Sequence, residues 1–454
     1  MPKAGSFQAL DDQHFSGFHW RAVLTTGLGV FTDFYDNTTI GMVLPMILLT
    51  FGIKHISGLQ AGALAGSALV GMGVGALIFG MLGQRGRKTF YGLDMLVMAI
   101  AAIAQMFVPG IWWLVAVRFV LGLGIGGDYV LSPTIMSEHA NQKDRGKLLA
   151  LGFATMSQLG PIVAALLALL LLRGLHVSHD LTWRIVLGAG AIPALSVLYL
   201  RRRMPETARY LARLADDREG AAEVVKSING AAAPALPGHD RRPFGAVLRQ
   251  HAPHFLAAGL LWMLFDLVAY STSLFGPSLI AHKLGFGPVT FVLFLHCLFS
   301  LPGALAASFL VDRIGRRWLQ AGGLFIGAVM LLLFATLHNA VAALPVLGLV
   351  FLGVYNFALN GPNVVTSFLG AELSPTRVRT VGQSFSVLGG RIGASTSAFL
   401  FPFLFVQTGL DTALMFLSLL AIAGAVLTMI LVPETKQRSL EDISRETEVV
   451  GSQA

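Results

Sequence analysis

The chain contains many long apolar segments, each close to the roughly 20 residues that a helix needs to cross a bilayer. In hydrocarbon, backbone polar groups can be satisfied only inside a helix or a closed barrel. The sequence therefore predicts an all-α membrane protein with twelve transmembrane helices in two sets of six. The first set is expected at about 20–47, 58–83, 89–109, 111–137, 146–172 and 182–201, and the second at about 253–281, 287–310, 319–338, 341–370, 378–405 and 409–432.

The composition agrees with this class. Hydrophobic residues make up 55% of the 454 residues and charged residues only 12%, a balance that a soluble chain of this length does not need. The first apolar segment lacks a small-residue cleavage site, so we expect a retained helix and not a signal peptide. The single cysteine, Cys297, excludes an internal disulfide framework and a cysteine-based metal site. No metal and no cofactor are expected.

A polar stretch separates the two sets. We expect an N-terminal six-helix bundle over 1–201, a linker over 202–250, a C-terminal six-helix bundle over 251–432 and a tail over 433–454. The linker is predicted to contain a short amphipathic helix near Thr207–Leu214.

The distribution of basic residues predicts the orientation. Most of the 32 Lys and Arg residues fall on the side of the chain ends, and the opposite loops keep little more than Lys54, Arg173 and Lys283. By the positive-inside rule, both termini and the linker are cytoplasmic, in a plasma (inner) membrane. The net charge of +8 follows from this topology and gives no reason to expect a nucleic-acid partner.

The two sets also repeat short polar motifs at an offset of about 228 to 235 residues. A duplicated six-helix half with a site between the halves is the architecture of a transporter. The repeated motifs are 80–88 with 308–317, Pro205-Glu206-Thr207 with Pro433-Glu434-Thr435, and Asp128 and Glu138 with Asn363 and Glu372.

Asp128 lies inside the fourth apolar segment, after glycines at 122, 124, 126 and 127. An ionisable side chain at this depth costs roughly 2.5 to 3.5 kcal/mol and is kept mainly where it faces a cavity. The glycines leave room for a close helix contact or a ligand. We expect Asp128 to take part in proton coupling; the alternative is a packing face whose aspartate forms a salt bridge with a neighbouring helix.

Two more groups of polar residues lie in apolar segments. Asp33 and Asp36, three residues apart in the first, share a helix face, and two close carboxylates in a low dielectric cannot both stay ionised. Such a pair suits a proton carrier, although Asp36 could instead cap a broken helix. Trp262, Asp266 and Tyr270 repeat every four residues in the seventh. Such spacing is usual for an aromatic packing ridge, but the aspartate in its middle favours a binding site.

Together these motifs resemble the major facilitator superfamily over nearly the whole chain. Within it, 126–138, read as Gly-Gly-Asp-Tyr-x-Leu-Ser-x-x-Ile-x-Ser-Glu, resembles the signature of the phosphate:proton symporters. The paired aspartates, the triplet and Gly361-Pro362-Asn363 resemble that family's first, seventh and tenth helices. The resemblance implies a symporter that carries a small anion, inorganic phosphate, together with protons by alternating access.

The resemblance also implies site residues. Four positions depart from the family: Val130 replaces a usual Pro, Arg391 stands where Lys is common, and the fifth-helix Gln aligns with Met156, two residues before Gln158. The fourth is Gln84, where the family has Asp, which puts in question a helix-locking contact of that loop. The expected substrate-binding residues are Tyr129, Gln158, Trp262, Asp266, Tyr270, Asn363 and Arg391, and the proton-coupling residues are Asp33, Asp36, Asp128 and Asp266.

The remaining charges are expected to bind the anion, brace helices or form gates. Arg391 could grip an anion in bidentate fashion, or form a structural salt bridge to an aspartate of the other half. Arg118 is expected to brace helices or couple to Asp128. Glu138 with Arg145 and Glu372 with Arg377 are predicted as gate ion pairs of the outward-facing state, with plain interfacial charge as the alternative; Asp312 and Arg313 complete this structural set.

An enzyme is not expected, because no nucleophile–base pair, phosphate-cradling loop or metal-ligand cluster is apparent in the sequence. A proton symporter of a small organic anion or sugar in the same fold is the nearest alternative, and a nutrient sensor that barely transports is another. The expected partners are the anion, protons and the lipid bilayer, and the chain is expected to be a monomer.

Overall fold

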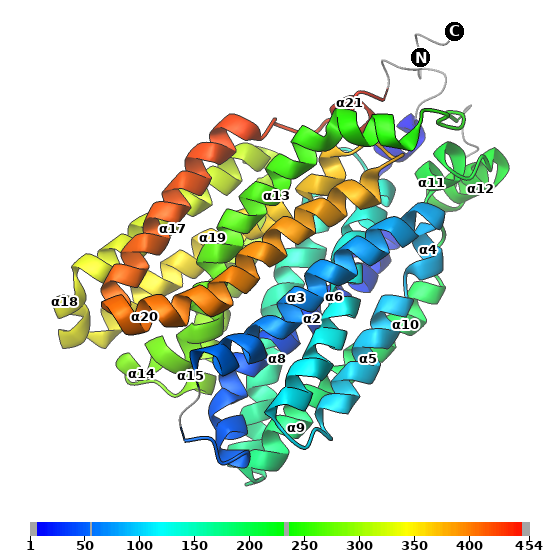
Figure 1. Ribbon diagram of the computed structural model, residues 1–454. Helices are drawn as coiled ribbons and strands as arrows, with labels where there is room; N and C mark the ends of the chain where they lie inside the picture. Colours follow the sequence, from blue (N-terminus) through cyan, green and yellow to red (C-terminus); the bar gives the residue numbers. More distant parts are fainter. Residues whose placement is uncertain (1–6, 55–56, 231–235, 447–454) are drawn as a thin grey trace.

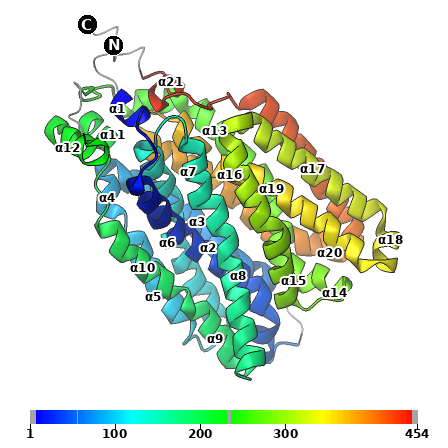
Figure 2. The same ribbon diagram turned by 180° about the vertical axis from the view of Figure 1, so that it is seen from behind.

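The computed structural model describes residues 7–54, 57–230 and 236–446, and this part of the chain is helical, with turns and short connections between the helices. Long helices run side by side in two groups (Figures 1 and 2). Nine segments of the described residues are long and apolar enough to cross a membrane. One of these, α20 (Arg379–Leu431), joins two helices at Gly409, whose φ of 82° is not helical. The two parts of α20 therefore count as two membrane crossings. The helices α2 (Gly17–Thr50) and α5 (Leu93–Gln105), which are not among the nine, bring the number of crossings to the predicted twelve.

The first half contains six membrane-crossing units. They are α2, α3 (Gly58–Leu82), α5, α6 (Ile111–His139), a unit of α7 (Arg145–Ala150), η2 (Leu151–Thr155), α8 (Met156–Leu169) and η3 (Leu170–Gly174), and a unit of α9 (His179–Ala189) and α10 (Ala191–Arg202). The short helices η1 (Gly83–Arg85) and α4 (Arg87–Phe90) connect α3 to α5.

The second half repeats this order. It contains α13 (Phe244–Phe275) with η4 (Gly276–Ile280) and α14 (Ala281–Lys283), a unit of α15 (Pro288–Leu295), η5 (His296–Ser300) and α16 (Leu301–Ile314), then α17 (Arg316–Thr336), α18 (His338–Ala343), α19 (Pro345–Leu373) and the two parts of α20.

Glycines allow two helices of the first half to approach closely. A Cβ added to Gly122 or Gly126 of α6 would collide with the backbone of α3 at Ala68 and Met72. Small residues permit this contact where lipid provides no hydrophobic force between helices. The glycines before Asp128 therefore serve helix packing, one of the two uses predicted for them.

One end of the bundle holds both described chain ends and the linker (Figure 1). We call this end the terminal side. Here lie α1 (Gln8–Asp11), α11 (Ala208–Arg213), α12 (Arg218–Asn229) and α21 (Leu440–Ile443). The α11 helix, which Thr207 caps by accepting a hydrogen bond from the Tyr210 amide, matches the predicted linker helix. The second linker helix, α12, was not predicted, and α13 begins within the predicted linker; 231–235 lie outside the described residues.

Candidate functional site

A cavity of about 100 Å³ is lined by residues of both halves. Aromatic and aliphatic side chains form much of its wall, and a few polar groups converge on it, as in most small-molecule sites. All seven residues predicted to bind substrate line this one cavity: Tyr129 and Gln158 from the first half, and Trp262, Asp266, Tyr270, Asn363 and Arg391 from the second. A site shared by the two halves is what alternating access requires.

Arg391 of α20 is the buried guanidinium of this cavity. It donates to Asp266 Oδ2 at 2.6 Å and to the Tyr270 hydroxyl at 2.9 Å. Its guanidinium carbon lies 5.0 Å from the centroid of the Tyr129 ring and 5.6 Å from that of Trp262. The aspartate comes from the same half, so a salt bridge to the other half, the alternative for Arg391, is not formed. Its Nε is buried and has no hydrogen-bond partner among the described residues.

Carboxamides line another part of the cavity. Gln158 Nε2 of α8 donates to Asn360 Oδ1 of α19 at 3.1 Å, which links the two halves. Asn363 Nδ2 donates to Ser157 Oγ at 3.4 Å, a second link of the same kind. Sequence reasoning missed Asn360, although it lies three residues before Asn363, on the same face of an apolar helix.

Asp36 and Arg118 form a buried ion pair of 2.8 Å within the first half. Gln105 donates to the other Asp36 oxygen at 3.1 Å, and Arg118 Nε donates to the Leu64 carbonyl at 3.2 Å. Arg118 therefore braces helices, as predicted, but its partner is Asp36 and not Asp128. Because α2 continues through this region as one helix, Asp36 does not cap a broken helix.

Asp33 differs from Asp36 because no guanidinium pairs with it among the described residues. Its carboxylate is fully buried and accepts a hydrogen bond from Asn37 Nδ2 at 2.5 Å. The Asp33 Oδ2 atom has no partner within hydrogen-bond geometry in the described part of the chain. Asn37 lines the cavity and donates to Asp33, so the Asn37 side chain lies between Asp33 and the cavity.

Asp128 does not line the cavity. It pairs with Arg201 at the end of α10 and accepts a hydrogen bond from Ser132 at 2.5 Å. Arg201 also pairs with Asp94 at 2.7 Å and lies over the Tyr91 ring, 3.7 Å from its centroid. The basic partner of Asp128 is therefore neither Arg118 nor Arg391. In this conformation the alternative prediction, a salt bridge to a neighbouring helix, describes Asp128.

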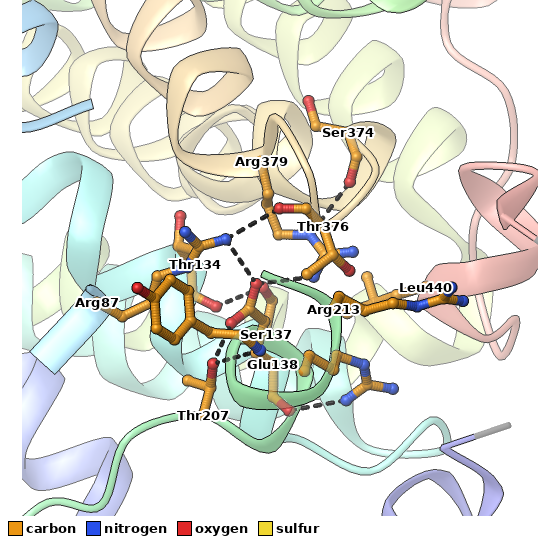
Figure 3. A network of polar contacts seen from close by, with 12 residues as sticks. Arg87, Thr134, Ser137, Glu138, Thr207, Arg213, Ser374, Thr376, Arg379 and Leu440 are labelled. Atoms are coloured by element: carbon orange, nitrogen blue, oxygen red, sulfur yellow. Dashed lines mark hydrogen bonds and ion pairs between the residues drawn. The ribbon is translucent and has the colours of Figure 1, made fainter. Parts of the chain in front are cut away.

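A network of charges on the terminal side joins the halves, and Figure 3 shows its part around Glu138. Arg379 of α20 donates to Glu138 Oε1 at 2.9 Å, and Arg87 of α4 lies 3.4 Å from the same oxygen. Thr207, in the linker, donates to Glu138 Oε2 at 2.5 Å. One carboxylate of the first half is thus held by a guanidinium from each half.

Glu372 of the second half has the matching set of partners. Arg145 of the first half donates to Glu372 Oε1 at 2.8 Å, Arg316 lies 3.0 Å from that oxygen, and Thr435 donates to Oε2 at 2.7 Å. The predicted pairs were therefore wrong in their partners. Arg145 pairs with Glu372 and not with Glu138.

The prediction for Arg377 was also wrong, because it forms no ion pair with the described residues, and Arg379, two residues on, is the cation that contacts Glu138. Arg313, also predicted for this structural set, is exposed, and Lys436 donates a hydrogen bond to its backbone carbonyl. Arg316, three residues later, carries the ion pairs instead. Sequence reasoning missed both Arg316 and Arg379.

The two loop motifs supply a further link each. Asp312 Oδ2 accepts a hydrogen bond from the Lys147 amide at 2.7 Å, and its other oxygen pairs with Arg316 at 2.6 Å. Gln84, at the equivalent position of the first half, donates to Thr380 Oγ1 of α20 at 2.5 Å. The helix-locking contact of the first loop, which the replacement of Asp by Gln84 had put in question, is therefore present as a neutral hydrogen bond.

On the terminal side, Arg209 of the linker binds Glu441 of the tail. Arg209 donates to Glu441 at 2.8 Å, to Asp11 at 2.8 Å and to the Glu138 carbonyl at 2.7 Å. Burial alone would raise the pKa of Glu441, but the Arg209 guanidinium outweighs it and holds that pKa at about 2. The described residues hold no group of three His, Cys, Asp or Glu side chains that could bind a metal.

Two six-helix halves, a polar cavity between them and ion pairs that join them at one end define a secondary transporter. The family model described as sugar (and other) transporter matches residues 22–447. The chain is 31% identical to the probable inorganic phosphate transporter 1-6 of Arabidopsis thaliana, over 97% of this chain and 96% of that protein. It is 32% identical to the inorganic phosphate transporter 1-11 of Oryza sativa subsp. japonica, over 96% and 89%.

Among solved structures, the proton:xylose symporter XylE from E. coli, a major facilitator superfamily protein, has a TM-score of 0.83 at 20% identity and covers 95% of this chain and 100% of its own. This likeness confirms the predicted fold. The chain therefore belongs to the sugar (and other) transporter family and has the fold of that solved structure; it is a multi-pass membrane transporter and not an enzyme.

Proposed function

We propose that the protein is a symporter of inorganic phosphate and protons that works by alternating access. The observation that carries this proposal is the cavity in which Arg391 contacts Asp266, the Tyr270 hydroxyl and the rings of Tyr129 and Trp262. A guanidinium with nearby neutral donors suits a tetrahedral oxyanion. The two relatives from Arabidopsis thaliana and Oryza sativa subsp. japonica, which match along 96% and 89% of their length, are named as inorganic phosphate transporters and support the same substrate.

Proton coupling follows from the Arg391–Asp266 pair. While Asp266 is ionised, it neutralises Arg391 and leaves no net charge to attract an anion. A proton on Asp266 removes that competition, so the guanidinium can bind one negatively charged ligand. A proton and a monoanion then enter together, because each makes the other's binding more favourable.

Asp33 is a second candidate for a coupling proton, since it is buried next to the cavity wall without a guanidinium. Asp36 and Asp128, also predicted as proton carriers, each hold an arginine within the first half in this conformation. We propose that in this state they anchor helices, and that any proton they bind is exchanged only after those pairs open.

The terminal network closes one end of the transport path. The Arg145–Glu372 and Arg379–Glu138 pairs join the halves, so both must break before the terminal side can open. By the positive-inside rule that side is cytoplasmic, so the network is the inner gate of an outward-facing or occluded state in the plasma (inner) membrane. We propose that the chain works as a monomer, because the cavity is completed by its own two halves.

The carboxamides of Gln158, Asn360 and Asn363 keep a small organic anion or a sugar as a second candidate, because amides can also bind hydroxyls. Proteoliposomes of the purified protein, given an inward proton gradient, distinguish the substrates. We expect uptake of radiolabelled phosphate, with no comparable uptake of xylose or of a small carboxylate. Gradient-driven uptake of xylose or the carboxylate, but not phosphate, would contradict the proposed substrate.

A further inference from the structure

A chain of hydrogen bonds runs from the backbone to the cavity and fixes the orientation of each side chain in it. Asn360 Nδ2 donates to the Ser300 carbonyl at 3.0 Å and to the Asn356 carbonyl at 2.9 Å. Carbonyl oxygens only accept, so the amide nitrogen of Asn360 must face them. Its Oδ1 atom must therefore face Gln158.

The same logic fixes Gln158. Its Nε2 places one hydrogen on Asn360 Oδ1 at 3.1 Å and the other on Ser157 Oγ at 2.8 Å. Ser157 Oγ donates its own hydrogen to the Ala154 carbonyl at 2.8 Å, so it can only accept from Gln158. The remaining polar atom, Gln158 Oε1, lies 3.0 Å from His296 Nδ1.

His296, in η5, must then carry its hydrogen on Nδ1, because the oxygen that faces it can only accept. In a neutral imidazole the other nitrogen, Nε2, holds a lone pair and is an acceptor. The residue lines the cavity, and Nε2 has no hydrogen-bond partner among the described residues. Nothing in the sequence shows which nitrogen of His296 faces the site.

The surroundings favour a neutral ring. The η5 helix packs against α8, α15, α16 and α19. Of these, α8 and α15 contain no ionisable residue. The charged residues of α16 and α19 are Asp312, Arg313 and Glu372, and they belong to the terminal side. The other titratable residue of α19 is Tyr355, whose hydroxyl donates to the Val268 carbonyl. In the cavity itself, Asp266 and Arg391 pair with each other, and Tyr129 and Tyr270 are neutral phenols.

We propose that neutral His296 accepts, at Nε2, a hydrogen bond from a hydroxyl of the bound phosphate monoanion and so selects protonated phosphate over oxyanions that carry no proton. Sulfate has the same shape, but all its oxygens are acceptors, and one of them would face the His296 lone pair. This inference rests on the proposed phosphate transport and adds the feature that distinguishes phosphate from sulfate.

The test measures the affinities of purified protein for inorganic phosphate and for sulfate by calorimetry at about pH 6, in wild type, His296→Phe and His296→Gln. The phenyl ring keeps the shape and loses the acceptor, whereas the glutamine amide oxygen can replace Nε2. We expect phosphate affinity to fall roughly tenfold in His296→Phe, as for one lost hydrogen bond to a charged ligand, with sulfate affinity unchanged or higher. His296→Gln should stay within about threefold of wild type.

An unchanged ratio of phosphate affinity to sulfate affinity in His296→Phe would overturn the inference. If both affinities fall equally, His296 is a packing residue. If wild type binds no phosphate, the proposed function itself fails, which separates the two claims. A measurement on wild type needs no variant. Its phosphate affinity should decline from pH 6 to pH 8 at least as steeply as the monoanion fraction, because loss of the Asp266 proton weakens anion binding in the same direction, and tighter binding of the dianion would contradict the inference.

Discussion

The cavity and the terminal network both bury arginine–carboxylate pairs, but the pairs are arranged differently. In the cavity, Arg391 and Asp266 come from one half, and the Nε atom of Arg391 has no hydrogen-bond partner in the part of the chain that the structure describes. In the network, Arg145–Glu372 and Arg379–Glu138 each join one half to the other. A pair within one half can be opened by a proton and a ligand without moving the halves. A pair between halves breaks only when the halves move, so it reports the conformation and not the ligand.

The largest expected effect on phosphate binding is at Arg391, on the cavity side of this comparison. Arg391→Gln removes the cation and should weaken phosphate binding on the order of 100-fold or more, because charge-assisted bonds to a desolvated anion are lost. Arg391→Lys should keep part of the affinity as a point charge without the bidentate geometry. Equilibrium binding of radiolabelled phosphate measures both, with exposed Arg173→Gln as control. A Gln variant that binds like wild type would make Arg391 structural.

The next effect is at Glu372, on the network side. Glu372→Gln leaves Arg145 and Arg316 beside a neutral amide. This should destabilise the closed conformation by roughly 3–5 kcal/mol, because the two buried guanidinium groups lose their carboxylate partner. The terminal side should then open more often, while phosphate binding survives. In a Cys297→Ser chain, Lys147→Cys should react faster with an impermeant maleimide. The exposed Arg313→Gln variant is the control, and equal labelling in the Glu372 variant would show that this pair does not hold the gate.

The two copies of the loop motif should differ by a smaller amount. Asp312→Asn leaves Arg316 with one carboxylate fewer and weakens a charge-assisted bond, so it should cost roughly 1.5–3 kcal/mol. Gln84→Leu removes one neutral hydrogen bond to Thr380 and should cost roughly 0.5–1.5 kcal/mol. Thermal unfolding in one detergent compares them. If Gln84→Leu were the more damaging, the first copy would be the stronger lock.

The smallest effect concerns the tail. Because Arg209 holds the pKa of Glu441 at about 2, below its ordinary 4.5, the pair contributes stability above about pH 4.5 and loses it as the pH falls towards 2. Docking of the tail should therefore not weaken as the pH falls from 8 to 5. Limited proteolysis of the tail across that range checks this, with Glu441→Gln as the undocked reference. A wild-type tail that becomes sensitive as the pH falls from 8 to 5 would contradict the assignment.

The fold and part of the cavity could be predicted because they depend on local patterns, and the other cavity residues were implied by the family resemblance. Apolar length places the helices, and the four-residue spacing of Trp262, Asp266 and Tyr270 places them on one face. The ion pairs could not be predicted in this way, because each joins segments far apart in the chain. The repeat offset of about 234 residues, applied to Arg145, would nevertheless have selected Arg379 instead of Arg377.

Asp128 shows the other limit of the sequence. Its depth and its glycines are visible, but the partner that decides its role, Arg201, lies at the end of another helix. A buried carboxylate in a membrane helix therefore predicts that a partner exists, but not whether that partner is a ligand or an arginine.

The central claim is that the proton binds at the cavity pair. The most direct test is Asp266→Asn in proteoliposomes, assayed for proton-driven accumulation of phosphate and for exchange of internal for external phosphate. The amide permanently removes the charge that competes for Arg391, so the variant should exchange phosphate but not concentrate it up a proton gradient. An Asp266→Asn protein that accumulates phosphate to the wild-type ratio would contradict the account.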